Sequence, residues 1–335
     1  MKQDFLKITT RGLYCEAGGF YLDPKLVVNH AVITHAHSDH AVRGNKNVYC
    51  TSPTAGFMKL KFGIRNSDSY HIKEYNDTFR LGDVNVTLFP AGHILGSAQV
   101  LMEHHGIKYL YTGDFKLTAD GSCENFHFVS AEVLYTETTF ASPAYAHPNP
   151  EEEISKLNDM EGKNILIGAY SLGKAQRVTQ LVTKHCPEKK VIVHSNAIPF
   201  HRIYESFGYS LGGWEFFSRN LLRDNTHVVY IVPPSVYNKY GSNKTFLKTF
   251  ATGWKNFYRA NDFSLTISDH ADWKELHTLI ARVKPKTIFT LHGDGSRLQK
   301  HFAGQAMNVV LMSGKKQPEA FSKTLTLFSN ENIER

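Results

Sequence analysis

Short apolar runs, each followed closely by a glycine, an aspartate or a histidine, recur along most of the chain. Runs of this kind that are rich in β-branched and aromatic residues predict strands. Apolar residues spaced three and four apart predict a helix over Lys174–His185. Strands mixed with helical segments indicate an α/β protein. The expected strands are Ala31–Thr34, Val84–Phe89, Gln99–Glu103, Tyr109–Thr112, Val133–Thr136, Asn164–Gly168, Val191–His194, His227–Val232, Ser264–Ile267 and Thr287–Leu291.

A proline-rich segment interrupts this pattern. Ala141–Pro150 contains three prolines and no continuous hydrophobic period, so it is predicted to be a linker. Glu151–Glu153 then begins a helix, because acidic side chains favour the positive N-terminal end of the helix dipole. A second irregular stretch lies near Ala251–Asp262. We therefore expect an inserted domain over residues 148–262 and a main body formed by residues 1–147 and 263–335.

Composition narrows the class of protein. The 335 residues are 41% hydrophobic and 21% charged, which fits a globular protein and excludes a disordered chain or a coiled coil. The apolar runs are shorter than the roughly 18 residues of a transmembrane helix, and the N-terminus lacks the apolar core of a signal peptide. We expect a cytoplasmic protein that does not bind a membrane. The four cysteines form no CxxC pair and are expected to be reduced structural thiols.

Charge and histidine content point to chemistry. A net charge of +7 favours a polyanionic partner such as a nucleic acid. The densest of the histidine clusters is His35-Ala-His37-Ser-Asp39-His40, directly after an expected strand. Two imidazoles spaced two residues apart at a strand end can point at one ion, and Asp39 and His40 on the next turn can serve a second ion nearby. Divalent metals such as zinc favour this set of nitrogen and oxygen ligands.

Three later residues of ligand type also follow expected strands. Alone, each would more often be an ordinary hydrogen-bonded loop residue, but together they extend the histidine cluster. Open α/β sheets place their sites at the carboxyl ends of strands, which favours a common metal centre. These residues are His93, Asp114 and His292.

The order of these motifs resembles the metallo-β-lactamase superfamily, whose signature is HxHxDH followed by a distant histidine, an aspartate and a last histidine. Two further motifs narrow the resemblance to the β-CASP nucleases: Glu137 in Tyr135-Thr-Glu-Thr-Thr-Phe140, and His270 in Ser268-Asp-His-Ala-Asp-Trp273. The resemblance implies an α/β fold, namely a metallo-β-lactamase αββα sandwich with an inserted α/β β-CASP domain. The predicted insertion has the length that this implies.

Within that group the chain most resembles the bacterial ligase-associated DNA exonucleases, which are Artemis-like. This resemblance implies a metal-dependent DNA exonuclease that acts in DNA repair and has a DNA ligase as functional partner. The matching segments are Arg11-Gly-Leu-Tyr-Cys15, Gly19-Phe-Tyr-Leu-Asp-Pro24, Tyr170-Ser-Leu-Gly-Lys-Ala-Gln-Arg177 and the His270 motif.

The resemblance also implies a ligand set for two divalent metal ions, with zinc expected and manganese as the alternative. One ion would be held by three histidines and the other by an aspartate and two histidines, and one aspartate would bridge them. The first three are His35, His37 and His93; the second three are Asp39, His40 and His292; the bridge is Asp114.

Three residues would act on the substrate by the same resemblance. Asp39 would orient the attacking hydroxide, and His270, paired with Glu137, would protonate the leaving oxygen. The segment Ser171-Leu-Gly173-Lys174 follows a strand and opens a helix, where free amides, a glycine and a lysine suit a substrate phosphate. An ordinary strand-to-helix turn explains the same residues equally well.

Several functions stay open at this level. A histidine at position 292 is typical of the RNA-cleaving branch, yet the ligase-associated family carries it too, so this motif does not decide between DNA and RNA. The resemblance to the ligase-associated family favours DNA. The nearest alternative is an RNA-processing nuclease like RNase J or the mRNA 3′-end cleavage factors. A small-molecule metallo-hydrolase is disfavoured by the insertion, by Glu137 and His270, and by the positive charge. The intact ligand set argues against a non-catalytic binding module.

Overall fold

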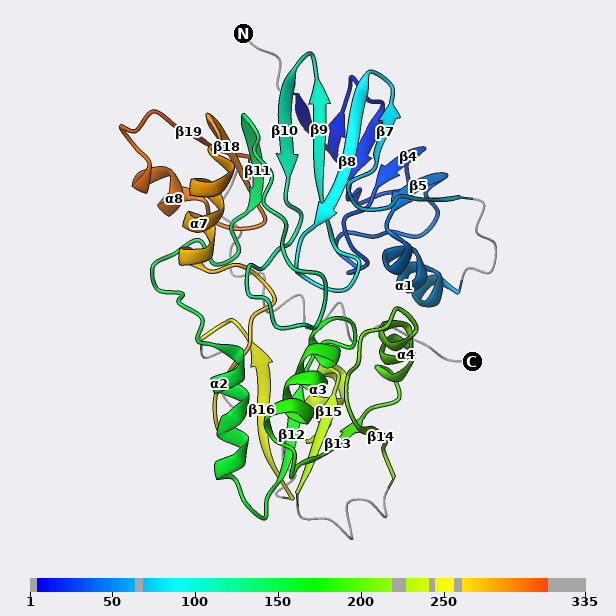
Figure 1. Ribbon diagram of the computed structural model, residues 1–335, viewed down its shortest axis with the longest axis vertical. Helices are drawn as coiled ribbons and strands as arrows, with labels where there is room; N and C mark the ends of the chain where they lie inside the picture. Colours follow the sequence, from blue (N-terminus) through cyan, green and yellow to red (C-terminus); the bar gives the residue numbers. More distant parts are fainter. Residues whose placement is uncertain (1–4, 64–68, 219–226, 241–244, 256–260, 313–335) are drawn as a thin grey trace.

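Three β-sheets organise the chain. The computed structural model describes residues 5–63, 69–218, 227–240, 245–255 and 261–312 (Figure 1). Residues 313–335, the last part of the predicted main body, lie outside the described residues. Two of the sheets pack face to face, and the third lies apart from them at the opposite end of the molecule.

The first sheet is built from the N-terminal strands in sequence order. An antiparallel meander comes first, and the later strands are parallel, so that the HxHxDH sequence follows a parallel strand near the middle of the sheet. The strands are β1 (Leu6–Thr9), β2 (Gly12–Cys15), β3 (Phe20–Leu22), β4 (His30–Val32), β5 (Asn47–Cys50) and β6 (Tyr70–Ile72).

The second sheet has the order β19-β18-β11-β10-β9-β8-β7. β7 to β10 are antiparallel, whereas β10, β11, β18 and β19 run parallel to one another. The carboxyl ends of β10, β11 and β18 therefore meet at one edge. The strands are β7 (Thr78–Leu81), β8 (Val84–Pro90), β9 (Ala98–His104), β10 (Ile107–Tyr111), β11 (Val133–Glu137), β18 (Thr287–Leu291) and β19 (Asn308–Leu311).

A layer of helices covers the outer face of each of these two sheets. Between the sheets lies a continuous core to which both contribute, with Phe20 and Val32 from the first and Val100 and Tyr111 from the second. Helix α1 (Ser52–Phe62) packs on the first sheet, and α7 (Trp273–Val283) and α8 (Ser296–His301) pack on the second. This layering confirms the predicted αββα sandwich.

The third sheet is entirely parallel, with the order β14-β13-β15-β12-β16-β17, and helices lie on both of its faces. Its strands are β12 (Asn164–Gly168), β13 (Lys190–Val193), β14 (Trp214–Phe216), β15 (Val228–Val232), β16 (Phe246–Thr252) and β17 (Leu265–Thr266). The helical elements of this part are α2 (Pro150–Ser155), η1 (Lys156–Asp159), α3 (Lys174–His185), α4 (Ile198–Ser206), α6 (Pro234–Tyr237) and η2 (Asn238–Tyr240).

β17 belongs to the third sheet although it lies beyond residue 262. We therefore propose that the insertion, predicted as residues 148–262, extends to Thr266. Below, "insertion" denotes residues 148–266 and "main body" the residues on either side of it. Within the described residues, no helix has both the length and the apolar character that crossing a lipid bilayer requires.

The insertion is held against the main body by apolar packing and by buried charges. Phe57 of α1 packs against Tyr204 of α4, with ring centroids 5.6 Å apart. Arg177 of α3 donates hydrogen bonds to Asp120 of the main body and to Asp269, just after the insertion. Only 3% of the arginine side chain is exposed, and the carboxylate of Asp120 is buried as well. Burying a guanidinium is costly unless it is fully paired, so this contact depends on both carboxylates.

We predict that Asp120→Asn lowers the free energy of unfolding by about 3 kcal/mol at neutral pH, because the buried guanidinium loses one counter-charge. Burial alone would raise the pKa of Asp120, but Lys116 and Arg177 outweigh it and lower the pKa from 3.8 to about 2. The carboxylate therefore stabilises the fold above about pH 4, and this contribution disappears as the pH falls toward 2. Urea unfolding followed by circular dichroism at several pH values measures both effects.

Asp83→Asn is the matched control, since Asp83 pairs with Arg80 and both side chains are largely exposed. Such a substitution should change the free energy of unfolding by less than about 0.5 kcal/mol. Equal effects of the two substitutions would contradict a role of Asp120 in holding the insertion.

Candidate metal centre

The HxHxDH sequence forms a tight turn just after β4 at the edge of the first sheet. The amides of His40 and Ala41 both donate to the carbonyl of His37, which folds the segment back on itself. His35 and His40 are buried, His37 is half-buried and Asp39 is exposed. The turn thus directs three imidazoles inward and leaves one carboxylate at the surface.

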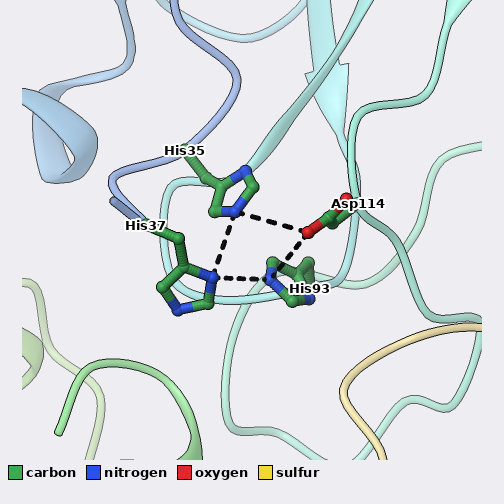
Figure 2. A group of neighbouring side chains, drawn as sticks. All are labelled: His35, His37, His93 and Asp114. Atoms are coloured by element: carbon green, nitrogen blue, oxygen red, sulfur yellow. Dashed lines mark hydrogen bonds and ion pairs between the residues drawn. The ribbon is translucent and has the colours of Figure 1, made fainter. Parts of the chain in front are cut away.

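Three imidazoles from two loops converge on one point (Figure 2). Nδ1 of His37 lies 3.1 Å from Nε2 of His35 and 3.1 Å from Nε2 of His93, which follows β8. Burial and the neighbouring imidazoles lower the pKa of His35 and of His93 well below the usual value, so both rings are neutral near pH 7. Neutral imidazoles are the form that binds a metal.

Each of these rings has its second nitrogen bound to an acceptor, which fixes the tautomer. Nε2–H of His37 donates to the carbonyl of Leu172 at 3.1 Å, and Nδ1–H of His93 donates to the carbonyl of Asp269 at 2.7 Å. Nδ1–H of His35 donates to the hydroxyl of Thr34, whose own proton goes to a carboxylate. The three inner nitrogens therefore present lone pairs to one another, and this arrangement fits a cation among them.

Asp114 lies at the centre of the site. It follows β10 through Gly113, which has a φ of 56° and on which a Cβ would lie 3.0 Å from Thr34, so the close approach requires glycine. Its Oδ2 lies 3.7 Å from Nε2 of His35, 3.9 Å from Nε2 of His93 and 3.3 Å from Nε2 of His40. One carboxylate oxygen thus lies within 3.9 Å of a ring nitrogen of His35, His93 and His40.

Negative charge is concentrated around His40. Burial alone would lower its pKa, but Asp114, Asp39 and Asp23 outweigh burial and raise the pKa of His40 well above its usual value. Oδ2 of Asp39 lies 3.7 Å from Nε2 of His40, and the ring of His292 stacks on that of His40 with centroids 5.1 Å apart. Several carboxylates crowded around one imidazole fit a second cation on this side of Asp114.

Four of the seven predicted metal ligands lie close together, and the other three lie beside them. Among the described residues, four of them have ligand atoms within 4.8 Å of one another: His35, His37, His93 and Asp114. His40 adjoins Asp114, whereas Asp39 and His292 contact His40 without joining such a cluster. The neighbouring ends of β10, β11 and β18 explain why Asp114 and His292, far apart in sequence, lie at the same edge.

Asp23, which orients two of the predicted ligands, was not among the site residues predicted from the sequence. Its Oδ1 accepts from the amide of Thr34, and its Oδ2 accepts from the hydroxyl of Thr34 at 2.7 Å, from Nδ1–H of His40 at 2.8 Å and from the hydroxyl of Tyr111 at 3.0 Å. Asp23 is buried and has a φ of 42°. The available signal was an aspartate directly after the apolar run Phe20–Leu22 and directly before a proline.

Glu137 and His270 form a pair beside the centre. Nδ1–H of His270 donates to Oε2 of Glu137 at 2.9 Å. Burial alone would lower the pKa of His270, but the carboxylates of Glu137 and Asp114 outweigh it and raise the pKa to about 9. His270 is therefore protonated near pH 7.

Asp114, Glu137 and His270 make up a second cluster of potential ligand atoms. Both oxygens of Glu137 are already engaged, however, because Oε1 accepts from the amide of Phe115 and Oε2 accepts from Thr139 as well as from His270. Nδ1 of His270 is likewise engaged as a donor. These bonds favour a pair that orients His270 over a third metal site.

The turn that opens α3 lies against His37, but its lysine faces the interior. Lys174 is 5% exposed, and its ammonium lies 3.0 Å from Oδ1 of Asp269 and also donates to the carbonyl of Ile267. This geometry does not support the predicted phosphate contact by Lys174. Ser171 and Gly173 belong to the same turn, where the side chain of Gln176 accepts from the amide of Gly173 and donates to the carbonyl of Ser171.

Residues 261–306 match a protein family described as the Zn-dependent metallo-hydrolase RNA specificity domain. The chain is 34% identical over 303 residues to a probable DNA ligase of Opitutus terrae, an alignment that covers 85% of this chain and 29% of the ligase. It is 26% identical to the DNA cross-link repair protein SNM1 of Arabidopsis thaliana, covering 79% of this chain and 61% of that protein. It is 28% identical to the 5′ exonuclease Apollo of Danio rerio, covering 44% of this chain and 29% of Apollo.

The chain thus spans less than a third of the ligase and about three fifths of SNM1. The alignments with these two relatives nevertheless cover most of the chain, and the matched metallo-hydrolase segment contains His270 and His292. The paired sheets, the histidine turn and the third sheet agree with the same relationship. These similarities support placing the chain in the β-CASP group of the metallo-β-lactamase superfamily.

Proposed function

We propose that this chain is a two-metal phosphodiesterase that degrades DNA from an end. The observation that carries the proposal is the convergence of three imidazole lone pairs beside Asp114, with Nε2 of His40 3.3 Å from Oδ2 of the same carboxylate. A shared carboxylate between two ligand groups is what a pair of neighbouring divalent ions requires, since its charge offsets their mutual repulsion.

His35, His37 and His93 would hold one ion, Asp39, His40 and His292 the other, and Asp114 would contact both. When bound, such a pair supplies an activated water at neutral pH and stabilises negative charge on a phosphate oxygen. The nitrogen and oxygen ligands and the zinc-dependent family description favour zinc, with manganese as the alternative.

The side chains around the ions would divide the proton transfers between them. Asp39, exposed at the mouth of the site, would orient the attacking water. His270 is protonated near pH 7 and held by Glu137, so it is suited to protonate the leaving oxygen. Hydrolysis of a phosphodiester needs one group that orients the attacking water and another, protonated group that donates a proton to the leaving oxygen.

Relatives and charge favour a nucleic acid, and DNA in particular. The relatives include a probable DNA ligase, a DNA cross-link repair protein and a 5′ exonuclease, which support DNA repair and a functional link to a ligase. The net charge of +7 suits a polyanion. The RNA specificity domain matched by residues 261–306 supports the alternative of an RNA-processing nuclease that uses the same residues.

Product analysis separates these alternatives. End-labelled single- and double-stranded DNA, and RNA of the same sequence, would be incubated with the protein loaded with zinc, manganese or magnesium. We expect stepwise shortening of DNA from one end, with RNA degraded more slowly. Preferential degradation of RNA would favour the RNA-processing function, and internal cuts would contradict an exonuclease.

We predict that Asp114→Ala abolishes binding of both ions, because one carboxylate serves both ligand groups. Elemental analysis of protein purified without chelator should give about two metal ions per chain for the wild type and fewer than one for the variant. Asp83→Ala, which removes an exposed carboxylate far from the histidine turn in sequence, is the control and should retain both ions. Loss of only one ion from Asp114→Ala would contradict a bridging role.

We predict that His270→Gln slows the chemical step by about 10²- to 10⁴-fold, the usual loss when a general acid is removed, while metal content stays unchanged. Glu137→Gln should slow it less, since the imidazole remains but loses the partner that orients it. Single-turnover rates combined with metal analysis measure both effects. Metal loss equal to that of a His35→Ala variant would instead identify His270 as a ligand.

A further inference from the structure

Two of the three converging imidazoles take their orienting hydrogen bond from outside the N-terminal part of the main body. The acceptor for His37 is the carbonyl of Leu172, in the turn between β12 and α3 of the insertion. The acceptor for His93 is the carbonyl of Asp269, in the segment that leaves the insertion. His35, by contrast, depends on the neighbouring Thr34.

The segment that carries the second acceptor is held by two buried cations of one helix. Lys174 and Arg177, three residues apart on α3, lie 3.0 Å and 2.9 Å from the same Oδ1 of Asp269. Lys174 also donates to the carbonyl of Ile267, and Arg177 donates to that of Ser268. Every residue from 267 to 269 is therefore bound to α3 through its carbonyl or its carboxylate.

The turn between β12 and α3 also packs against the loop that contains His93. Gly173 has a φ of 85°, and a Cβ at this position would lie 2.3 Å from Cγ2 of Ile94 and 3.5 Å from Nε2 of His37. The start of α3 is thus packed directly against both ligand loops, with no room for a side chain between them. A tether that only joined the two parts of the molecule would not need this closeness.

Buried cations are a costly way of joining two segments, because apolar residues can do so without desolvating charge. Charged hydrogen bonds are directional, however, and here they fix the orientation of the segment that ends in the Asp269 peptide group. Residues that orient a metal ligand typically alter metal affinity by about 10- to 100-fold when removed.

We propose that Lys174 and Arg177 are positioning residues of the metal centre: by clamping residues 267–269 they fix the Asp269 carbonyl that orients His93. The adjacent turn fixes His37 through Leu172, so the insertion completes the three-histidine site. This inference rests on the proposed metal binding. It requires neither a particular nucleic acid nor hydrolysis, and metal affinity therefore tests it without a substrate.

The test measures the affinity of the full-length chain for Co²⁺ and Zn²⁺ by competition with a chelator, together with the visible absorption of bound Co²⁺. Lys174→Met removes one cation of the clamp, and Asp269→Asn removes the shared carboxylate while keeping the peptide carbonyl. We expect each variant to weaken the binding of one of the two ions by about 10- to 100-fold and to alter the absorption spectrum of bound Co²⁺. The double variant should be no weaker than the weaker single variant, because both act through one contact.

Lys184→Met is the matched control, because Lys184 lies on the same helix but is exposed and pairs with the exposed Glu151. Its metal affinity should stay within about twofold of the wild type. Thermal unfolding in EDTA shows whether each variant is folded without metal, and Asp269→Asn replaces Lys174→Met if the latter does not fold.

Wild-type affinity for both ions in a folded Lys174→Met or Asp269→Asn variant would overturn the proposal, and equal weakening of both ions would overturn the specific link to His93. Either result would leave the proposed nuclease activity standing. Conversely, a protein that binds metal as expected but degrades no nucleic acid would contradict the proposed function and not the positioning role.

Discussion

Nδ1 of His37 lies 3.1 Å from Nε2 of His35 and 3.1 Å from Nε2 of His93, so the lone pairs of the three nitrogens repel one another and the surrounding structure must hold them in place. Each outer ring nitrogen has an acceptor, so none of the rings can rotate away without losing a hydrogen bond. Asp114 faces the lone pairs with a carboxylate, and burial keeps the rings neutral. A cation between them relieves the repulsion, which is why we interpret the arrangement as a metal centre.

That constraint accounts for the placement of groups that do not themselves bind metal. Asp23 accepts hydrogen bonds from Thr34, His40 and Tyr111, and so orients His40 directly and His35 through Thr34. Glu137 accepts hydrogen bonds from Phe115, Thr139 and His270. The first two hold its carboxylate in place, and the third orients the His270 ring. The insertion contributes the acceptor for His37, so the centre lies where three parts of the chain meet: the first sheet, the second sheet and α3.

Much of this arrangement could be predicted from the sequence, because it depends on local patterns. The strands before His93, Asp114 and His292 are rich in apolar residues and bounded by glycine or aspartate, and the structure has β8, β10 and β18 there. The helix predicted over Lys174–His185 is α3 with the same bounds. The short strands β1, β2 and β3 were missed, since strands of three or four residues carry little periodicity. The seven-residue strand β16 was also missed, and its end overlaps the stretch near Ala251–Asp262 that was predicted to be irregular.

The parts that could not be predicted depend on contacts between distant residues. A lysine at the start of a helix gives the same sequence signal whether it faces a phosphate or a buried carboxylate, and only the position of Asp269 shows that Lys174 faces inward. Likewise Asp23 gains its importance from Tyr111 and His40, which are close to it in space alone. The strand predicted over Ser264–Ile267 is present as β17, but its pairing with β16 of the third sheet could not be predicted from the sequence.

The central claim is that two metal ions lie on opposite sides of one carboxylate. Crystals of the zinc-loaded protein, measured on both sides of the zinc absorption edge, would test it most directly through anomalous difference density. We expect two peaks about 3.5–4 Å apart, one among His35, His37 and His93 and the other beside His40, with Asp114 between them. A single peak among Asp114, Glu137 and His270, or no peak at the three histidines, would contradict the claim.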